Sequence, residues 1–229
     1  MQRRSRRLVN ATMKNPIHSL MLAALAVTSS PWLVSAADPV ALFDGTDLSA
    51  WTMDKAGAWV TKDGELQPAA EGAGGYLWTK EKFEDFTLTL EFKMSKDCNS
   101  GVFFRTDPKN AVQGGFEIQV FDSAGKDEIG THDCGAFYDA KAPSVNAAKP
   151  AGEWNTMTIT AKGPLLTVVL NGQTVVDVNI DDWSEANKNP DGSKNKFKTA
   201  LKDLPRNNHI GLQFHGHPVW YRNVMVERL

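Results

Sequence analysis

The stretch Phe86-Thr-Leu-Thr-Leu-Glu-Phe-Lys-Met94 alternates apolar and polar residues without a break. Successive side chains of a β-strand point to opposite faces, so this alternation predicts a strand that is half buried and half exposed. The predicted core face consists of Phe86, Leu88, Leu90, Phe92 and Met94. A strand of this kind is typical of an antiparallel sheet with one face in water.

Short extended segments of the same type follow along the chain, separated by turn residues. They cover residues 102–106, 114–122, 157–161, 165–170, 174–178 and 209–215. The pairs Asp63-Gly64 and Asn171-Gly172 predict two-residue hairpin turns. One short helix is expected around residues 197–201, too little to cover a parallel sheet. The chain is therefore predicted to be all-β, with two antiparallel sheets packed as a sandwich.

The composition is that of an ordinary globular protein. The chain has 229 residues, 41% hydrophobic and 23% charged, with a formal net charge of −2. This length fits one sizeable β domain. The charge balance gives no electrostatic reason to expect a nucleic acid partner.

The first 36 residues have the features of a secretory signal peptide. Arginines at positions 3, 4, 6 and 7 precede the apolar run 20–27, and Val34-Ser35-Ala36 resembles a small-residue cleavage site. We expect a signal peptide at 1–36, a single domain at 37–229, and a periplasmic or secreted product. No membrane segment is expected after cleavage. The twin Arg6-Arg7 leaves the export route open.

Two cysteines, Cys98 and Cys134, lie in the predicted mature part. Export would expose them to an oxidising compartment, so we expect a disulfide between them. Two unpaired buried thiols are the alternative, since a sequence gives no Cα distance.

Several strands carry polar groups on the face opposite the core. If these strands are neighbours in one sheet, the groups line one surface: Glu91, Arg105, Glu117, Gln119, Gln213 and His215. Carboxylates, imidazole and guanidinium are the usual groups for proton transfer and for holding a developing oxyanion. Each residue alone has an ordinary structural explanation, for example a cross-strand ion pair.

Ordered motifs extend over almost the whole predicted mature chain. They are Leu42 to Trp51, Phe86 to Phe92, Asn99 to Arg105, Gly115 to Asp122, Ala151 to Asn155, Leu170 to Gly172, Ile210 to Gly216 and Tyr221 to Asn223. Together they resemble the 3-keto-disaccharide hydrolase domain family (DUF1080). The resemblance implies a concanavalin A-like jelly roll that receives carbohydrate, and activity on glycosides oxidised at C3 of the glucosyl ring.

A 3-keto group makes the neighbouring C2 proton acidic, so a base can remove it and the C1 substituent can leave. Water then adds to give the free 3-keto sugar. We expect Glu117 or His215 as the base, Arg105 as the charge partner of the oxyanion, and Glu91 or Asp122 as the acid.

Two alternatives remain for this chemistry. Glu91 and Glu117 are the candidate pair for hydrolysis by two carboxylates. A divalent cation held by Glu117, His215 or an aspartate is the other route, although no cofactor is expected.

The candidate substrate-binding residues are amides and aromatic side chains: Asn99, Gln119, Gln213, Phe121, Tyr138 and Trp220. A non-catalytic carbohydrate-binding module would use the same kinds of residue. Such a module has little use for a carboxylate, a guanidinium and an imidazole that converge, so an enzyme is the favoured interpretation.

Overall fold

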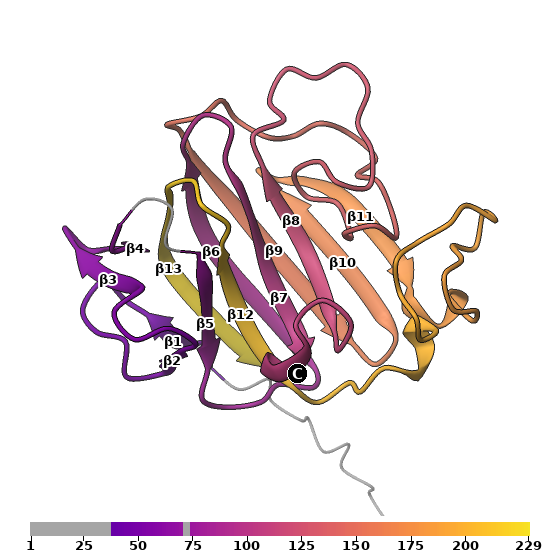
Figure 1. Ribbon diagram of the computed structural model, residues 1–229, viewed down its shortest axis with the longest axis horizontal. Coiled ribbons are helices and arrows are strands. Elements are labelled where there is room, and N and C mark those ends of the chain that lie inside the picture. The colour runs from indigo at the N-terminus through magenta and orange to yellow at the C-terminus, as the bar shows by residue number, and fades with distance from the viewer. Residues whose placement is uncertain (1–37, 71–73) are drawn as a thin grey trace, which may run out of the picture. The chain divides into compact units, whose positions relative to one another are not determined.

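The computed structural model describes residues 38–70 and 74–229 (Figure 1). The predicted signal peptide lies outside these residues. Within them, no helix has the length and hydropathy needed to cross a membrane. The described chain forms two antiparallel β-sheets, and the predicted fold class is confirmed.

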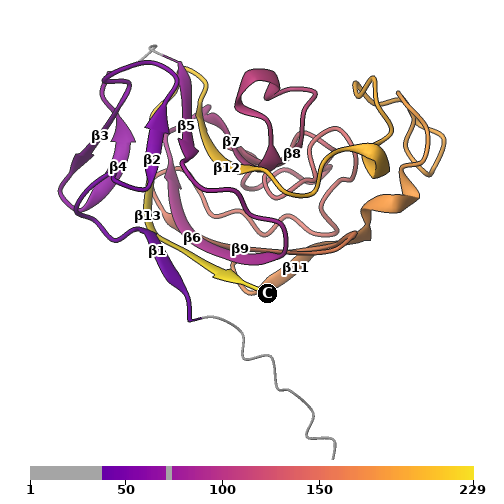
Figure 2. The same cartoon turned by 90° about the horizontal axis from the view of Figure 1, so that it is seen from below.

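The larger sheet, sheet A, has eight strands. Its order is β11 (Gln173–Asn179), β10 (Leu165–Leu170), β9 (Trp154–Lys162), β6 (Phe86–Met94), β13 (Val219–Arg228), β4 (Glu65–Pro68) and β3 (Trp59–Lys62), with β1 (Val40–Phe43) also paired to β13. The smaller sheet, sheet B, has the order β2 (Trp51–Met53), β5 (Gly75–Thr79), β12 (His209–Phe214), β7 (Asn99–Thr106) and β8 (Phe116–Phe121). Figure 2 shows the sheets as two layers.

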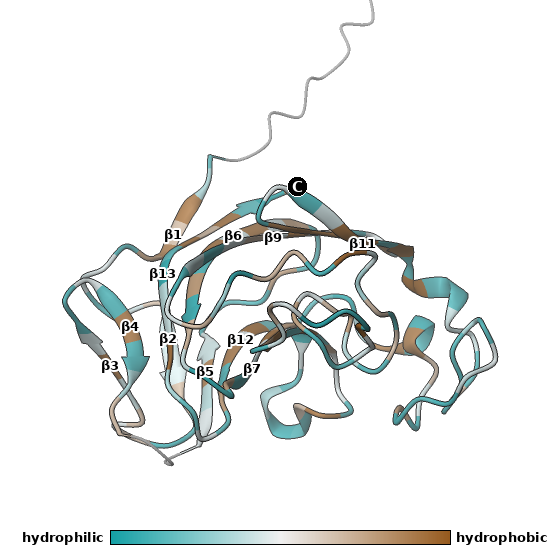
Figure 3. Ribbon diagram, turned by 90° about the horizontal axis from the view of Figure 1, so that it is seen from above, coloured by the Kyte–Doolittle hydropathy of each residue, from teal (hydrophilic) through white to brown (hydrophobic). Residues whose placement is uncertain are grey.

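The core lies between the two sheets. All five predicted inward residues of β6 are fully buried, and its polar residues alternate with them at intermediate exposure. Strand β8 contributes Phe116, Ile118 and Val120 to the same core. Figure 3 shows hydrophobic residues on strands of both layers. Burial of this apolar surface is the main favourable contribution to folding.

The two predicted hairpin turns are confirmed. Asp63-Gly64 joins β3 to β4, and Asn171-Gly172 joins β10 to β11. All four residues have positive φ angles, between 50° and 81°. A two-residue hairpin turn of this type needs positive φ at both positions, which explains the Asp-Gly and Asn-Gly pairs.

Strand β7 contains a bulge near its end. Phe103 pairs with Gly211 and Thr106 with His209, so two residues of β7 face one residue of β12. Arg105, one of these two, has a φ of 50°. A bulge breaks the strict alternation of side chains along a strand. Arg105 therefore leaves the outer face of sheet B, on which the alternation had placed it beside Phe103.

The remaining short elements are 3-10 helices: η1 (Pro108–Asn110), η2 (Ile180–Asp182) and η3 (Leu201–Asp203). The helix expected at residues 197–201 is wrong in position, because η3 begins at Leu201. Phe197 and Leu201 are both buried, so this loop is anchored by core contacts rather than by a helix.

Cys98 and Cys134 are free thiols, and the predicted disulfide is wrong for this structure. Both side chains are enclosed in the core, where they pack as small apolar groups. Burial raises the pKa of both thiols to about 12. The alternative from the sequence, two unpaired buried thiols, is the arrangement observed.

Both thiols should resist alkylation in the folded protein, because the thiolate is the reactive form and neither thiol is ionised near pH 8. We expect no labelling by iodoacetamide at pH 8 in native buffer and two labels per chain in denaturant. Mass spectrometry of the intact protein measures both states. An unlabelled protein in denaturant without reductant would instead establish the disulfide.

Candidate active site

A cavity of about 280 Å³ opens on the outer face of sheet B. We call it the glutamate cavity. It is lined by Tyr76, Asn99, Phe103, Val112, Glu117, Gln119, Tyr138, Lys196, Gln213 and His215. Strands β5, β7, β8 and β12 supply most of these residues, and two long loops supply Tyr138 and Lys196. Adjacent strands of one sheet thus bring together residues that are far apart in the sequence.

Glu117 is the carboxylate of this cavity. It lies on β8 with its neighbours Phe116 and Ile118 in the core, and the residue is 8% exposed. Within the described part of the chain, its carboxylate oxygens make no hydrogen bond or ion pair. Burial raises the pKa of Glu117 to about 7, and the positive charge of Lys196 limits the rise. A carboxylate with a pKa near neutrality is suited to accept a proton at physiological pH.

Gly101 makes room for the Glu117 carboxylate. It pairs with Gln119 in the β7–β8 register, next to Glu117. A Cβ atom added at Gly101 would lie 2.1 Å from Oε1 of Glu117 and 2.8 Å from its carboxyl carbon. The glycine is therefore required for this position of the carboxylate, because any larger residue would displace it.

Two aromatic rings line the site, Tyr76 and Phe103, and both pack against Trp78, which does not line it. Tyr76 stacks on Trp78 with ring centroids 5.2 Å apart, and Phe103 contacts both rings edge-on at 5.4 and 5.7 Å. Trp78 lies over Gly211 of β12, where an added Cβ would be 2.2 Å from the indole ring. Aromatic rings of this kind are platforms for the C–H face of a sugar.

Lys196 provides the cation of the cavity. Its backbone N–H donates to the Asp139 carboxylate at 2.6 Å, and its carbonyl accepts from the Gln113 side chain at 3.0 Å. The ammonium lies 3.8 Å from the centre of the Tyr138 ring. Burial lowers the pKa of Lys196, while Glu117 and Asp139 act in the opposite direction. The loop is thus fixed so that a half-buried charge faces the glutamate.

The predicted amides also lie in the cavity. Gln119 donates from Nε2 to Oδ1 of Asn99 at 3.1 Å, and Gln213 donates from Nε2 to the Tyr76 hydroxyl at 3.2 Å. His215 follows the end of β12 and is exposed at the rim. Phe121 lines an adjoining cavity that shares Asn99, Gln119 and Tyr138 with this one.

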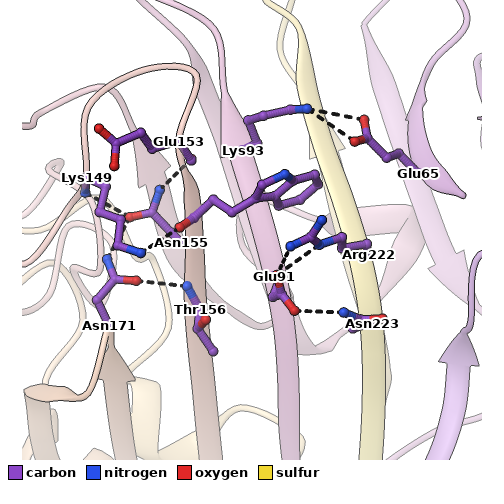
Figure 4. Close-up of polar contacts among 11 residues, drawn as sticks. Glu65, Glu91, Lys93, Lys149, Glu153, Asn155, Thr156, Asn171, Arg222 and Asn223 are labelled. Carbon is purple, nitrogen blue, oxygen red and sulfur yellow. Dashed lines mark hydrogen bonds and ion pairs between the residues drawn. The ribbon is translucent and has the colours of Figure 1, made fainter. Parts of the chain in front are cut away.

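Two residues predicted for the site, Glu91 and Trp220, lie instead on strands of sheet A, and Figure 4 shows Glu91 with its partners there. Glu91 forms an ion pair with Arg222 at 2.6 Å and accepts from Asn223 at 2.7 Å. Trp220 donates to Gln67 at 2.7 Å. The alternation within each strand was correct, but it gave no information on which sheet the strand joins. Glu91 is therefore not a partner for Glu117, which removes the two-carboxylate alternative.

Two further predicted residues have structural contacts. Asp122 accepts a hydrogen bond from the backbone N–H of Asp97 at 2.9 Å and lines neither cavity. Arg105 is fully buried, and its guanidinium donates to the carbonyls of Glu84 and Gly163 and pairs with Asp85 at 3.0 Å. The bulge in β7 turns this side chain away from the cavity, so Arg105 is not the charge partner there.

Lys196 and Tyr76 were missed by the sequence reasoning. Tyr76 lies in a short apolar segment after a glycine-rich stretch, and the sequence gives no sign there beyond its aromatic ring. Lys196 lies in a charged loop, and nothing in that loop indicates which lysine turns inward. Within residues 38–70 and 74–229, no three His, Cys, Asp or Glu side chains form a group that could hold a metal ion.

The two packed antiparallel sheets form a jelly roll, with an aromatic, carboxylate-bearing cavity on the outer face of its smaller sheet. The chain belongs to the family of 3-keto-alpha-glucoside-1,2-lyase-like domains, whose sequence profile matches residues 38–227. The predicted resemblance is confirmed.

Individual relatives agree with this assignment. A curated 3-keto-disaccharide hydrolase of Bacteroides thetaiotaomicron is 28% identical to this chain. The match covers 93% of this chain and 86% of the relative. A Parabacteroides distasonis ATCC 8503 protein, a glycosyl hydrolase by name, is 30% identical with a TM-score of 0.77, covering 84% of this chain and 100% of its own. The Bacillus subtilis carbohydrate-binding module CBM66 is 16% identical with a TM-score of 0.50. The match covers 78% of this chain and 95% of that module, and it shows the fold alone.

Proposed function

We propose that this protein cleaves 3-keto-glycosides by removing the C2 proton, with Glu117 as the base. The observation that carries the proposal is the Glu117 carboxylate, which is buried in a cavity without a hydrogen-bond partner in the described chain and has a pKa of about 7. A purely structural carboxylate is expected to be paired or solvated, since an isolated buried charge is costly. The name of the curated relative supports the substrate class.

The proposed reaction is an elimination followed by a hydration. Glu117 takes the C2 proton, and the electron pair forms a C1=C2 double bond as the C1–O bond breaks. The leaving oxygen receives a proton from an acid. Water then adds its hydroxyl to C1, and a proton returns to C2. The products are 3-keto-glucose and the free leaving group, so the net reaction is hydrolysis.

Lys196 takes the role first assigned to Arg105. During proton removal the charge moves to the keto oxygen, and a cation in a partly buried cavity stabilises that charge more than it would in water. Tyr138 is the candidate acid in place of Glu91 and Asp122. Burial raises the pKa of Tyr138, as do the negative charges of Glu117 and Asp139, so its phenol keeps a proton at neutral pH. His215 at the rim remains the alternative base.

Incubation with 3-keto-trehalose tests the proposal. We expect 3-keto-glucose and glucose to appear in equal amounts, as followed by chromatography. Binding without any product from 3-keto-glucosides would favour the second candidate function, a non-catalytic carbohydrate-binding module.

Gly101→Ala should impair this reaction through the position of Glu117. Its Cβ would overlap the Glu117 carboxylate, so the base must move. A displacement of about 1 Å costs on the order of 10²-fold in rate, and we expect kcat/KM to fall by about that factor. Thermal unfolding should show a folded variant. A Gly101→Ala protein with wild-type kcat/KM would contradict the placement of the base.

We also infer that the protein is exported, on the basis of the basic, apolar and small-residue segments within residues 1–36. N-terminal sequencing of protein purified from a native-like host should find a mature start near residue 37. An intact Met1 on folded protein would contradict export.

A further inference from the structure

Asp139 lies where two loops meet beside the glutamate cavity. It follows Tyr138 in the long loop between β8 and β9, and its side chain is 17% exposed. One carboxylate oxygen, Oδ2, accepts from the backbone N–H of Lys196 at 2.6 Å. The other, Oδ1, lies 3.0 Å from Nε2 of His132. A single carboxylate therefore connects the loop of Tyr138 with the loop that carries the cation of the site.

The backbone of Asp139 is fixed independently of its side chain. Its N–H donates to the carbonyl of Thr131 at 3.0 Å, and its carbonyl accepts from Nδ2 of Asn189 at 3.4 Å. Its φ angle is 58°, in the left-handed region that aspartate, asparagine and glycine adopt more readily than other residues. Asparagine and glycine are therefore the replacements that suit this backbone.

Tyr138 is attached to the strand that carries the base. Its backbone N–H donates to the carbonyl of Glu117 at 3.0 Å. The centre of its ring lies 4.7 Å from that of the His132 ring and 3.8 Å from the Lys196 ammonium. Both neighbours of the ring contact the Asp139 carboxylate, His132 through its side chain and Lys196 through its backbone. The position of the phenol thus depends on groups that Asp139 holds.

We propose that Asp139 is a positioning residue of this site, which holds the Lys196 ammonium and the Tyr138 ring in place through the contacts of its carboxylate. The inference rests on the proposed function, in which Lys196 stabilises the charge on the keto oxygen and Tyr138 protonates the leaving oxygen. Asp139 lines neither the glutamate cavity nor the adjoining one, so it acts through these neighbours and not on the substrate.

The charge of Asp139 has a separate effect on the same two groups. Among the described residues, the titratable groups that face Tyr138 and Lys196 are Glu117 on β8, His132 and Asp139. Burial lowers the pKa of Lys196, and the negative charges of Glu117 and Asp139 oppose this. Burial raises the pKa of Tyr138, and the same two charges raise it further. Loss of the Asp139 charge should therefore lower both pKa values.

Asp139→Asn keeps the position of the two groups and removes the charge. Asparagine can accept from the Lys196 N–H through Oδ1 and donate to His132 through Nδ2. We expect kcat at pH 7 to stay within a few-fold of wild type. The alkaline limb of the pH profile of kcat/KM should move to lower pH, because Lys196 and Tyr138 lose their protons earlier. The acidic limb should stay near pH 7, since burial and Lys196 determine the pKa of Glu117.

Asp139→Gly removes both contacts of the carboxylate while it accepts the positive φ. A displacement of Lys196 by about 1 Å should lower kcat by about 10²-fold. KM should change little, because Lys196 acts on a charge that develops only in the transition state. A merely structural role of Asp139 would instead lower the melting temperature and leave kcat of the folded protein unchanged.

Hydrogen–deuterium exchange followed by mass spectrometry gives a readout that does not depend on turnover. Peptides that contain Lys196 should exchange faster in Asp139→Gly than in wild type, and at the wild-type rate in Asp139→Asn. Asp191→Asn is the matched control, because Asp191 is an exposed carboxylate in the same loop that accepts from Ser193 and lines neither cavity. It should leave the pH profile and the exchange at Lys196 unchanged.

Wild-type kcat and wild-type exchange at Lys196 in Asp139→Gly would overturn the inference and leave the proposed function standing. An alkaline limb that does not move in Asp139→Asn would also overturn it, and this variant decides alone if Asp139→Gly does not fold. If the wild-type protein releases no 3-keto-glucose, the proposed function fails. The exchange at Lys196 then still decides whether Asp139 holds this lysine.

Discussion

Glu117→Gln is expected to lower kcat/KM for 3-keto-glycosides by about 10²–10⁴-fold, the usual contribution of a positioned general base. Glutamine has nearly the same shape and keeps hydrogen-bonding capacity, but it cannot accept the C2 proton. Steady-state kinetics of 3-keto-glucose release measures the loss. A variant with wild-type kcat/KM would transfer the role of base to His215.

The same substitution should stabilise the fold at neutral and higher pH. The carboxyl has an ordinary pKa of 4.5 and a folded pKa of about 7. Below pH 4.5 the group is protonated in both states and contributes nothing. As pH rises from 4.5 to 7, the unfolded chain releases the proton more readily, so wild-type stability falls. Glu117→Gln removes this cost, and we expect a gain of about 3 kcal/mol above pH 7.

Urea unfolding at pH 5 and pH 8 measures this effect. The stability difference between the variant and the wild type should be small at pH 5 and large at pH 8. A variant that is less stable than the wild type at pH 8 would indicate that Glu117 is a structural partner rather than a buried base.

Arg105→Met should cost about 3 kcal/mol of unfolding free energy, because it removes the three charge-assisted hydrogen bonds of a fully buried guanidinium, while its partner Asp85 is 33% exposed and still accepts from the Gly163 N–H. The guanidinium connects β7 to the turn at Gly163 and to Asp85, which precedes β6. Its removal leaves two carbonyls and a carboxylate without this donor. Burial lowers the pKa of Arg105 to about 10, so the side chain is charged at neutral pH.

Urea unfolding of Arg105→Met and kinetics of its folded fraction separate structure from catalysis. The folded fraction should keep kcat/KM within a few-fold of wild type. Arg222→Met is the control, because its ion pair with Glu91 is partly exposed and should contribute about 1 kcal/mol or less. A stable Arg105→Met protein without activity would restore the catalytic role that the sequence suggested.

The fold could be predicted because its determinants are local. The alternation in β6 and the turn pairs Asp63-Gly64 and Asn171-Gly172 depend on backbone geometry within a few residues. The position of η3 could not be predicted, since Phe197 and Leu201 are held by tertiary packing.

Only part of the candidate site could be predicted from the sequence. Glu117, Gln119 and Gln213 were placed correctly because their strands are regular. Glu91 was misplaced because alternation does not identify the sheet to which a strand belongs. Arg105 was misplaced because a bulge reverses the side-chain direction and leaves no clear mark in the sequence. Lys196 depends on the path of a long loop, which local patterns do not determine.

Turnover of 3-keto-trehalose in D₂O tests most directly the claim that Glu117 removes the C2 proton. Elimination and hydration place one solvent-derived hydrogen at C2, so NMR and mass spectrometry should find one deuterium there in the 3-keto-glucose released. Incubation of unlabelled 3-keto-glucose with the protein in D₂O corrects for exchange of the free product. Deuterium at C2 in excess of that control is the predicted result. Product with no deuterium at C2, released at an unchanged rate from substrate that carries deuterium at C2, would show direct hydrolysis at C1 and contradict the account.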